Sequence, residues 1–333
     1  MTIQSIGVVG AGAWGTALAQ AVINSGRDAL IWAHEPETVS DINRDRVNHT
    51  FLPEVQLDPK LKATSDIEEV AGQNALLMVA PAQHMRTIAG QLAGHLPDAR
   101  PVIICSKGIE QSSGKMMSTV LSETLPGASL AVLSGPTFAA EVARGLPAAL
   151  TLACENEDLG KLLAHAIGHA TFRPYWSDDI IGAQIGGAIK NVLAIAAGIV
   201  MGRKLGSNAH AALTTRGYAE MVRFGAALGA RAETLTGLSG LGDLILTCGS
   251  PQSRNMSLGI ALGEGKTLDE VLGARRSVSE GVYTASAVVE IAQDKGLDLP
   301  ICSAVHAIVS GSVGVDQAIE ELLARPIRAE HEA

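Results

Sequence analysis

Two lysines and an aspartate stand out among the side chains of this sequence that could do chemistry. Lys107 is two residues beyond an apolar run that ends at Cys105, and Lys190 stands among Ala, Ile and Val residues in a long apolar stretch. A lysine in such a stretch either extends to the surface or is partly desolvated, and desolvation disfavours the ammonium form. A desolvated amine is suited to exchange a proton with a substrate oxygen. Asp243, after a glycine-rich turn, is a further candidate for the chemistry of a site.

Other polar groups are suited to hold a phosphate. Arg254, in an SRN run, offers a planar guanidinium fork for two oxygens. Residues 134–137 (SGPT) follow an apolar run, and their proline suits the first turn of a helix, whose unpaired amides attract an anion. Thr247 is four residues beyond Asp243, so a helix would place both on one face. Each of these patches is also compatible with a capped surface loop.

Residues 10–15 (GAGAWG) fit the G-x-G-x-x-G pattern of dinucleotide-binding loops. The motif follows an expected strand and opens an expected helix, which is the context that the pattern requires. Gly10 would allow the tight turn, Gly12 the approach of the backbone to a pyrophosphate, and Gly15 close packing of helix on strand. The motif therefore predicts a site for NAD or NADP, with an ordinary glycine-rich turn as the alternative.

The choice between NAD and NADP stays open. An acidic residue about 20 positions after the motif would accept a hydrogen bond from the ribose 2′-hydroxyl of NAD. Glu35 is near that spacing, but Ala33 and His34 occupy the tip of the second expected strand. His34 could meet the 2′-phosphate of NADP or be a solvated loop residue. The sequence allows NAD, NADP or both.

The elements that must position these groups alternate between apolar strands and amphipathic helices in the first half of the chain. Strands are expected at residues 5–9, 28–33, 75–79, 102–105, 130–133, 148–153 and 170–175, and helices at 14–24 and 36–46. This alternation predicts an α/β fold whose N-terminal domain is Rossmann-like, with a doubly wound, mostly parallel sheet. Later residues predict only Ala-, Gly- and Leu-rich helices. We expect a dinucleotide-binding domain at residues 1–178 and an all-α domain for substrate binding and catalysis at 179–333.

Composition excludes several classes of function. Acidic residues outnumber basic ones, 34 to 25, and no long Lys/Arg run occurs, which argues against nucleic acid as a partner. The longest apolar run, residues 192–202, is shorter than the roughly 20 residues that cross a bilayer, so no integral membrane segment is expected. Four cysteines without a CxxC pair, and an N-terminus without a signal pattern, predict a cytoplasmic protein with reduced thiols. His165 and His169 lack a third ligand, so no metal site is expected.

Together these motifs resemble the NAD(P)-dependent glycerol-3-phosphate dehydrogenases, particularly the bacterial type, along almost the full chain. The shared runs are GAGAWGTALA (10–19), SKGIE (106–110), SGPTFAAE (134–141), GGAIKNVLAIAAGI (from 186), TRG (215–217), GLGDLILTC (from 240), SRN (253–255) and SEGVYTA (279–285). The glycine fingerprint is generic, whereas the ordered lysine, aspartate and SRN motifs are specific. The resemblance implies reversible reduction of dihydroxyacetone phosphate to sn-glycerol 3-phosphate, which feeds glycerophospholipid synthesis.

The resemblance also implies roles for individual residues. Lys190 would be the general acid/base at the C2 oxygen, Lys107 would orient the substrate near the nicotinamide, and Asp243 would position Lys190 or a substrate hydroxyl. With Thr247 added from its spacing, the further candidate substrate contacts are Gly135, Thr137, Thr247, Ser253, Arg254 and Asn255. The candidate cofactor contacts are Gly10, Gly12, Ala13, Trp14, Gly15, His34, Lys107, Ala139, Arg254, Val278 and Glu280. A homodimer is expected from the resemblance alone.

The chain departs from the family pattern at two positions. Met201 stands where an acidic residue is usual, which we expect to alter local packing, and His34 stands where many members have arginine. Two other interpretations compete with this one. A β-hydroxyacid or ketopantoate-type reductase would also use a lysine in its helical domain, but Lys107 and the SRN run favour a phosphorylated substrate. A protein that binds NAD(P) without catalysis would have no need of Lys190 and Asp243.

Overall fold

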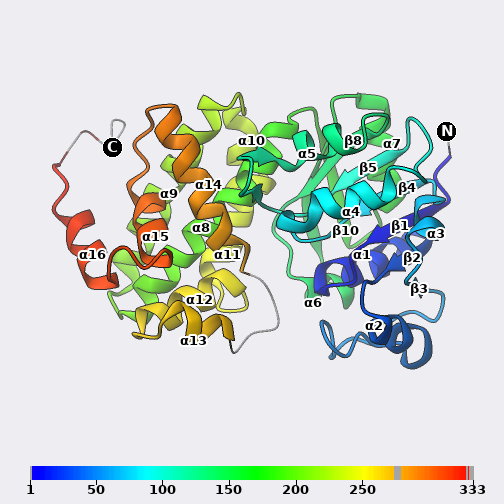
Figure 1. The fold of residues 1–333 in the computed structure, drawn as a ribbon, viewed down its shortest axis with the longest axis horizontal. Helices are drawn as coiled ribbons and strands as arrows, with labels where there is room; N and C mark the ends of the chain where they lie inside the picture. Colours follow the sequence, from blue (N-terminus) through cyan, green and yellow to red (C-terminus); the bar gives the residue numbers. More distant parts are fainter. Residues whose placement is uncertain (1, 274–278, 328, 330–333) are drawn as a thin grey trace. The chain divides into compact units, whose positions relative to one another are not determined.

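A computed structural model of the chain (Figure 1) describes residues 2–273, 279–327 and 329. The chain forms two compact units, one of Met1–Lys107 with Lys115–Gln184 and the other of Gly108–Gly114 with Ile185–Ala333. The sequence places a domain boundary after residue 178. That boundary stays a prediction, because the two units above are defined by contacts and not by domain function.

An eight-stranded sheet forms the centre of the first unit, in the order β10-β9-β8-β5-β4-β1-β2-β3. The strands are β1 (Ser5–Val9), β2 (Asp28–Trp32), β3 (Lys62–Thr64), β4 (Ala75–Met78), β5 (Pro101–Ile104), β8 (Ser129–Ser134), β9 (Ala148–Ala153) and β10 (Phe172–Ser177). The pairings are parallel except for that of β8 with β9. The expected mostly parallel, Rossmann-like sheet is thereby confirmed, and the short strand β3 was not anticipated.

The antiparallel pair has a simple cause in the connection between its strands. Only α6 (Ala139–Ala143) lies between β8 and β9. A five-residue helix spans about 7.5 Å, whereas a six-residue strand is about 20 Å long, so this helix cannot return the chain to the edge where β8 began. β9 therefore runs back along β8.

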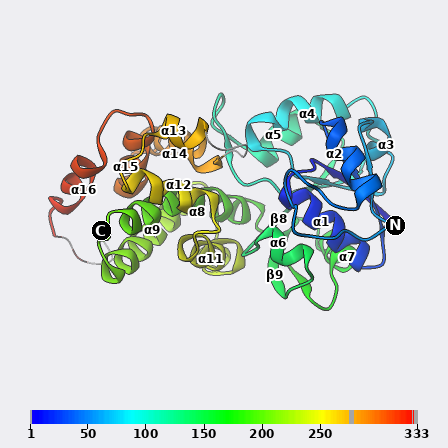
Figure 2. The same cartoon turned by 90° about the horizontal axis from the view of Figure 1, so that it is seen from below.

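Helices cover both faces of the sheet (Figure 2). They are α1 (Ala13–Asn24), α2 (Pro36–Ser40) with a π-helical turn at Asp41–Asp45, α3 (Ile67–Ala71), a 3-10 turn at Ala82–His84, α4 (Met85–Leu92), α5 (Met117–Thr124), α6 and α7 (Glu157–Ile167). Ile103 and Leu133 point to the core under α1, α6 and α7, while Val102 and Val132 point to the core under α3, α4 and α5. Burial on both faces explains why these strands are continuous apolar runs.

The second unit is helical. Its helices are α8 (Ile180–Gly202), whose first five residues belong to the first unit, α9 (Ser207–Ala227), α10 (Ala232–Thr236), a π-helical turn at Leu238–Gly242, α11 (Asp243–Gly249), α12 (Arg254–Gly263), α13 (Leu268–Gly273), α14 (Glu280–Asp294), α15 (Pro300–Val309) and α16 (Val315–Leu323). The two-residue strand β6 (Ile109–Glu110) also belongs to this unit, while β7 (Lys115–Met116) belongs to the first. The expected helical domain is therefore observed, with one short inserted segment.

Helix α8 is longer than its apolar run predicted. Its 23 residues have a mean hydropathy of 1.7 in their best window, so by length and composition alone the helix could cross a membrane. The apolar run at residues 192–202, taken alone, predicts a segment too short to cross a membrane. The helix is longer than that run, so this expectation was wrong about the length. However, 89% of that window is buried inside the protein, which is the environment of a core helix.

Glycines bring α8 and α12 into backbone contact. A Cβ atom built on Gly198 would lie 2.1 Å from the carbonyl oxygen of Met256, and Gly202, Gly259 and Gly263 leave similarly little space. Real Cβ atoms do not approach so closely, so these positions require glycine. Part of the glycine content, 36 of 333 residues, is therefore explained by helix packing rather than by turns.

Candidate active site

The glycine loop lies between β1 and α1, as the motif predicted. Gly10 has a φ of 116°, in the region that favours glycine, and its N–H donates to the carbonyl of Trp32. A Cβ on Gly15 would lie 1.8 Å from the carbonyl oxygen of Gly10, so Gly15 is required for packing. A Cβ on the exposed Gly12 would meet nothing within 4 Å. Space for an approaching ligand therefore lies beside Gly12, where the unpaired amides of α1 begin.

Three predicted substrate residues meet at the carboxyl ends of β5 and β8. The ammonium of Lys107 donates to the carbonyl oxygen of Gly135 at 3.0 Å, and the hydroxyl of Thr137 donates to the same oxygen at 3.2 Å. Gly135 has no room for a side chain, because a Cβ would lie 2.7 Å from the Cα and Cβ atoms of Leu150. The SGPT turn is thus held against β9 with one carbonyl facing the lysine. Carboxyl ends of strands are where ligands of open α/β sheets bind.

The remaining predicted cofactor residues of this unit stand around α1 and β2. Ala13, Trp14 and Ala139 are half-buried and contact the core beneath α1. His34 is exposed just beyond β2, with its ring centroid 6.2 Å from that of Trp32. An exposed imidazole at this strand tip can meet solvent or a ligand.

In the helical unit, Lys190, Asp243 and Thr247 form one buried cluster. The Nζ atom of Lys190 donates to Asp243 Oδ1 at 2.7 Å and to Thr247 Oγ1 at 2.8 Å. The Thr247 hydroxyl in turn donates to Asp243 Oδ1 at 3.2 Å. The lysine side chain is 9% exposed and that of the aspartate 1%, so Lys190 does not extend to the surface. The predicted placement of Asp243 and Thr247 on one helical face is confirmed by α11.

A second polar cluster begins one residue further along α8. Asn255 donates through Nδ2 to Asn191 Oδ1 at 2.9 Å, and its Oδ1 accepts from the N–H of Gly281 at 3.1 Å. Gly281 admits this contact because a Cβ there would lie 2.6 Å from the Asn191 carbonyl oxygen. Sequence reasoning missed Asn191 and Gly281. The one available signal was an amide side chain beside Lys190 in an otherwise apolar helix.

The other predicted residues of this unit lie at helix starts. Ser253 is the N-cap of α12, with its hydroxyl accepting from the N–H of Met256 at 3.3 Å. Arg254 is exposed at the first position of α12, and Glu280 is half-buried at the first position of α14. Val278, a predicted cofactor contact, lies outside the described residues.

Two cysteines next to these clusters are buried thiols. Burial raises the pKa of Cys248, in α11, to about 12, although the charge of Lys190 opposes the shift. Burial likewise raises the pKa of Cys105, two residues before Lys107, far above its ordinary value. Both thiols are therefore protonated at neutral pH and are poor nucleophiles.

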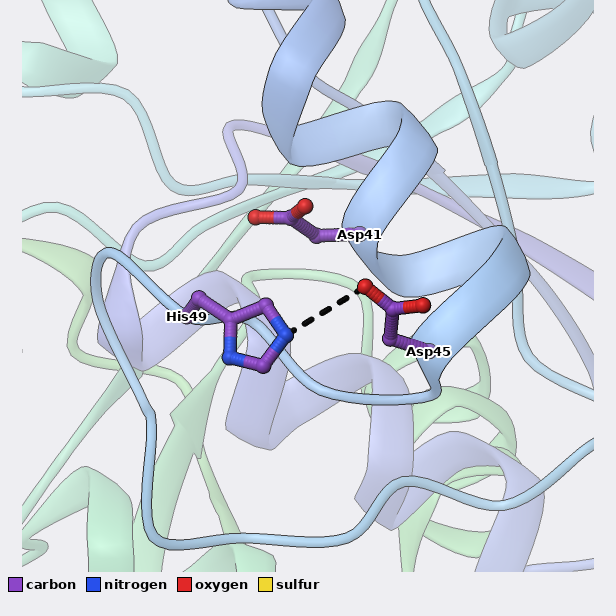
Figure 3. A group of neighbouring side chains, drawn as sticks. All are labelled: Asp41, Asp45 and His49. Atoms are coloured by element: carbon purple, nitrogen blue, oxygen red, sulfur yellow. Dashed lines mark ion pairs between the residues drawn. The ribbon is translucent and has the colours of Figure 1, made fainter.

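Among the described residues, one group of side chains could offer three ligand atoms to a metal ion. Figure 3 shows Asp41, Asp45 and His49, whose candidate ligand atoms lie within 4.8 Å of one another. Asp45 is already held by the guanidinium of Arg44 through hydrogen bonds of 2.8 and 2.9 Å, which lower the pKa of its carboxyl group to about 2. A fixed positive charge on the same carboxylate repels a cation. We assign no metal to this group.

A Rossmann-like unit with an open glycine loop and a helical unit with a buried lysine–aspartate pair define a nicotinamide-dependent oxidoreductase. Comparison with known proteins gives its family. The chain belongs to the NAD-dependent glycerol-3-phosphate dehydrogenase family, whose N-terminal profile matches residues 5–160 and whose C-terminal profile matches residues 179–320.

Relatives resemble the chain over nearly its whole length. It is 59% identical to glycerol-3-phosphate dehydrogenase [NAD(P)+] of Parvibaculum lavamentivorans, covering 99% of each chain. It is 56% identical to the enzyme of that name from Caulobacter vibrioides, covering 99% of this chain and 100% of the relative. The crystal structure of glycerol-3-phosphate dehydrogenase from Coxiella burnetii superposes with a TM-score of 0.93 at 38% identity, covering 97% of this chain and 99% of the other.

The rival class is similar in fold alone. A ketopantoate reductase from Ralstonia eutropha superposes with a TM-score of 0.60 at 18% identity, covering 95% of this chain. The matched family is NAD-dependent, and the relatives carry NAD(P)+ in their names. The cofactor is therefore NAD or NADP, as the sequence predicted.

Proposed function

We propose that this enzyme reduces dihydroxyacetone phosphate to sn-glycerol 3-phosphate, and catalyses the reverse reaction, with Lys190 as the general acid/base. The observation that carries the assignment of Lys190 is its burial, with the ammonium hydrogen-bonded to Asp243 and Thr247 at 2.7 and 2.8 Å. NADH or NADPH, when bound, supplies the hydride. The protein must then stabilise and protonate an oxygen.

The Lys190 cluster is suited to that task. Reduction of a ketone develops negative charge on its oxygen, and a nearby ammonium both stabilises this charge and delivers a proton. Asp243 and Thr247 restrict the orientation of Nζ, because they accept two of its three N–H bonds. In the reverse direction, the same amine accepts the proton of the alcohol. Asp243 is therefore a positioning residue for Lys190 in this proposal.

Arg254 is our candidate for the substrate phosphate. It lies exposed at the start of the ten-residue helix α12, where its guanidinium and the unpaired amides of the first turn favour an anion. Ser253 caps that turn, and Asn255 directs its amide to Asn191. The family resemblance also proposes Lys107, Gly135 and Thr137 as substrate contacts, and the polar atoms of these three residues meet at the Gly135 carbonyl in the first unit.

The cofactor residues fit a dinucleotide. Gly12 would let the pyrophosphate approach the start of α1, where Ala13 and Trp14 follow, while Gly10 shapes the turn and Gly15 allows the close packing beneath it. His34, beyond β2, would face the adenosine ribose, where the 2′-hydroxyl or 2′-phosphate lies. The other proposed cofactor contacts among the described residues are Lys107, Ala139, Arg254 and Glu280. Val278 is also proposed and lies outside the described residues.

We also propose a cytoplasmic homodimer. The family resemblance supports both parts of this proposal. The four cysteines are free and buried, which suits a reducing compartment.

Steady-state kinetics test the reaction. Oxidation of NADH and of NADPH is measured with dihydroxyacetone phosphate and, in parallel, with ketopantoate and other 2-oxoacids. We expect turnover with dihydroxyacetone phosphate. Turnover only with the 2-oxoacids would contradict the proposal, and tight cofactor binding without turnover of any substrate would favour a binding protein.

A further inference from the structure

Asn48 connects a distant segment to the glycine loop. The residue is fully buried and follows the π-helical turn that is drawn with its neighbours in Figure 3. Its Nδ2 donates to the carbonyl oxygen of Ala11 and to Thr16 Oγ1, both at 2.8 Å. Its Oδ1 accepts from the N–H of Phe51 at 3.0 Å, which fixes the orientation of the amide. Asn48 thus hydrogen-bonds the middle of the GAGAWG motif from 37 positions away.

The contact determines which way one loop peptide faces. In a trans peptide the C=O and the following N–H point in opposite directions. Asn48 holds the carbonyl of Ala11 toward the interior, and the hydroxyl of Thr16 donates to the same oxygen at 3.4 Å. The N–H of Gly12 must therefore point outward. Ala11 is buried and Gly12 is exposed, in agreement with this orientation.

We infer that Asn48 is a positioning residue of the cofactor site, which presets the N–H of Gly12 for the pyrophosphate of NAD(P). The space beside Gly12 is open, since a Cβ there would meet no atom within 4 Å. A loop already held in its binding conformation loses less conformational entropy when the ligand binds. Asn48 therefore raises cofactor affinity without lying in the loop. This inference rests on the proposed cofactor site.

The same segment offers a matched control. Asn43 exchanges two hydrogen bonds with the backbone of Ala63, donating through Nδ2 at 2.8 Å and accepting at Oδ1 at 2.9 Å. It fixes the segment to the edge strand β3, and among the described residues it makes no hydrogen bond to the glycine loop. Substitution of Asn43 is therefore expected to perturb the segment that contains Asn43 and Asn48. The hydrogen bond from Asn48 to the Ala11 carbonyl should stay in place.

The test compares Asn48→Asp with Asn43→Asp in the full chain. Aspartate keeps the size and the acceptor of asparagine but loses both Nδ2 donors. The dissociation constants of NADH and NADPH are measured by calorimetry without substrate, beside thermal melting curves. We expect Asn48→Asp to weaken binding of both cofactors about tenfold or more, which corresponds to about 1.4 kcal/mol, and Asn43→Asp less than about twofold. In the assay, the KM for cofactor should rise and that for dihydroxyacetone phosphate should not.

A second variant covers the case in which Asn48→Asp is unfolded at the assay temperature. Thr16→Val keeps the side-chain shape and removes one donor to the Ala11 carbonyl and one acceptor of Asn48, so we expect about a threefold weaker cofactor affinity. Wild-type affinity in every folded variant, or equal losses in the Asn48 and Asn43 variants, would overturn the inference. A wild-type enzyme that binds NADH but does not turn over dihydroxyacetone phosphate would instead overturn the proposed function alone.

Discussion

Lys190 and Asp243 are 53 positions apart, on α8 and α11, yet Lys190 Nζ and Asp243 Oδ1 lie 2.7 Å from each other in a buried environment. A buried charge that loses its partner is costly, whereas a pair removed together leaves an uncharged core. The stability of the site and its chemistry can therefore be separated by experiment.

We expect Lys190→Met to abolish turnover and to lower the free energy of unfolding by about 3 kcal/mol, because the buried carboxylate of Asp243 loses the ammonium of its ion pair. The double variant Lys190→Met with Asp243→Asn should recover most of that stability and no activity. Urea denaturation and steady-state kinetics measure the two effects. Lys295→Ala, at an exposed lysine, is the charge-matched control. Measurable turnover by the double variant would exclude Lys190 as the acid/base.

Gly12 and Gly15 are expected to respond differently to alanine. Gly15→Ala places a Cβ 1.8 Å from the Gly10 carbonyl oxygen, so the variant should be strongly destabilised, by more than about 3 kcal/mol. Gly12→Ala meets no protein atom within 4 Å and should melt near the wild-type temperature, while binding NADH and NADPH about tenfold more weakly. Melting curves measure the stability of both variants, and calorimetry measures their affinity for NADH and NADPH. Wild-type cofactor affinity in Gly12→Ala would place the pyrophosphate elsewhere.

His34 provides a test of cofactor choice. A carboxylate at the tip of β2 accepts a hydrogen bond from a 2′-hydroxyl and repels a 2′-phosphate. We therefore expect His34→Asp to shift the ratio of kcat/KM toward NADH by about tenfold, mainly by weakening NADPH. Glu35→Gln, at the neighbouring exposed carboxylate, is the control and should shift the ratio less. An unchanged ratio in His34→Asp would remove His34 from the ribose site.

Glu220 predicts a pH dependence of stability. This carboxylate on α9 is 1% exposed and accepts from the N–H groups of Ile301 at 2.6 Å and Cys302 at 3.0 Å, at the start of α15. Burial raises its pKa, while these two hydrogen bonds and the charge of Arg223 oppose the shift. A raised pKa means that the folded protein holds this proton more tightly than the unfolded chain does. The stabilising contribution is therefore complete below the ordinary glutamate pKa and is lost as the pH rises through the folded value.

Comparison with Glu220→Gln isolates this effect, because glutamine does not titrate. The difference in free energy of unfolding between wild type and variant should be most favourable to wild type near pH 4 and should decline toward neutral pH. Urea denaturation at intervals from pH 4 to 8 gives the difference. A difference that grows with pH would contradict the assignment.

Local patterns predicted much of the fold and part of the site. The strand alternation, the glycine loop and the shared helical face of Asp243 and Thr247 depend on neighbours within a few residues, so sequence spacing reveals them. The antiparallel direction of β9 was not predicted, because it follows from the length of the connection through α6.

Contacts between distant residues were beyond such reasoning. Asn48 is one polar residue in a loop, and nothing in its neighbours indicates that it reaches the carbonyl of Ala11. The same holds for the bonds that join Asn191, Asn255 and Gly281 from three helices. Only packing brings these groups together, and a single sequence does not record packing partners.

The glycine contact between α8 and α12 constrains how this protein can evolve. Lys190 is on one of these helices and Arg254 begins the other, so their separation depends on backbones in contact rather than on side chains of adjustable length. Every substitution of Gly198 or Gly259 adds at least a Cβ, which has no space. The distance between the residues proposed as acid/base and as phosphate contact therefore resists change by single substitutions at these glycines.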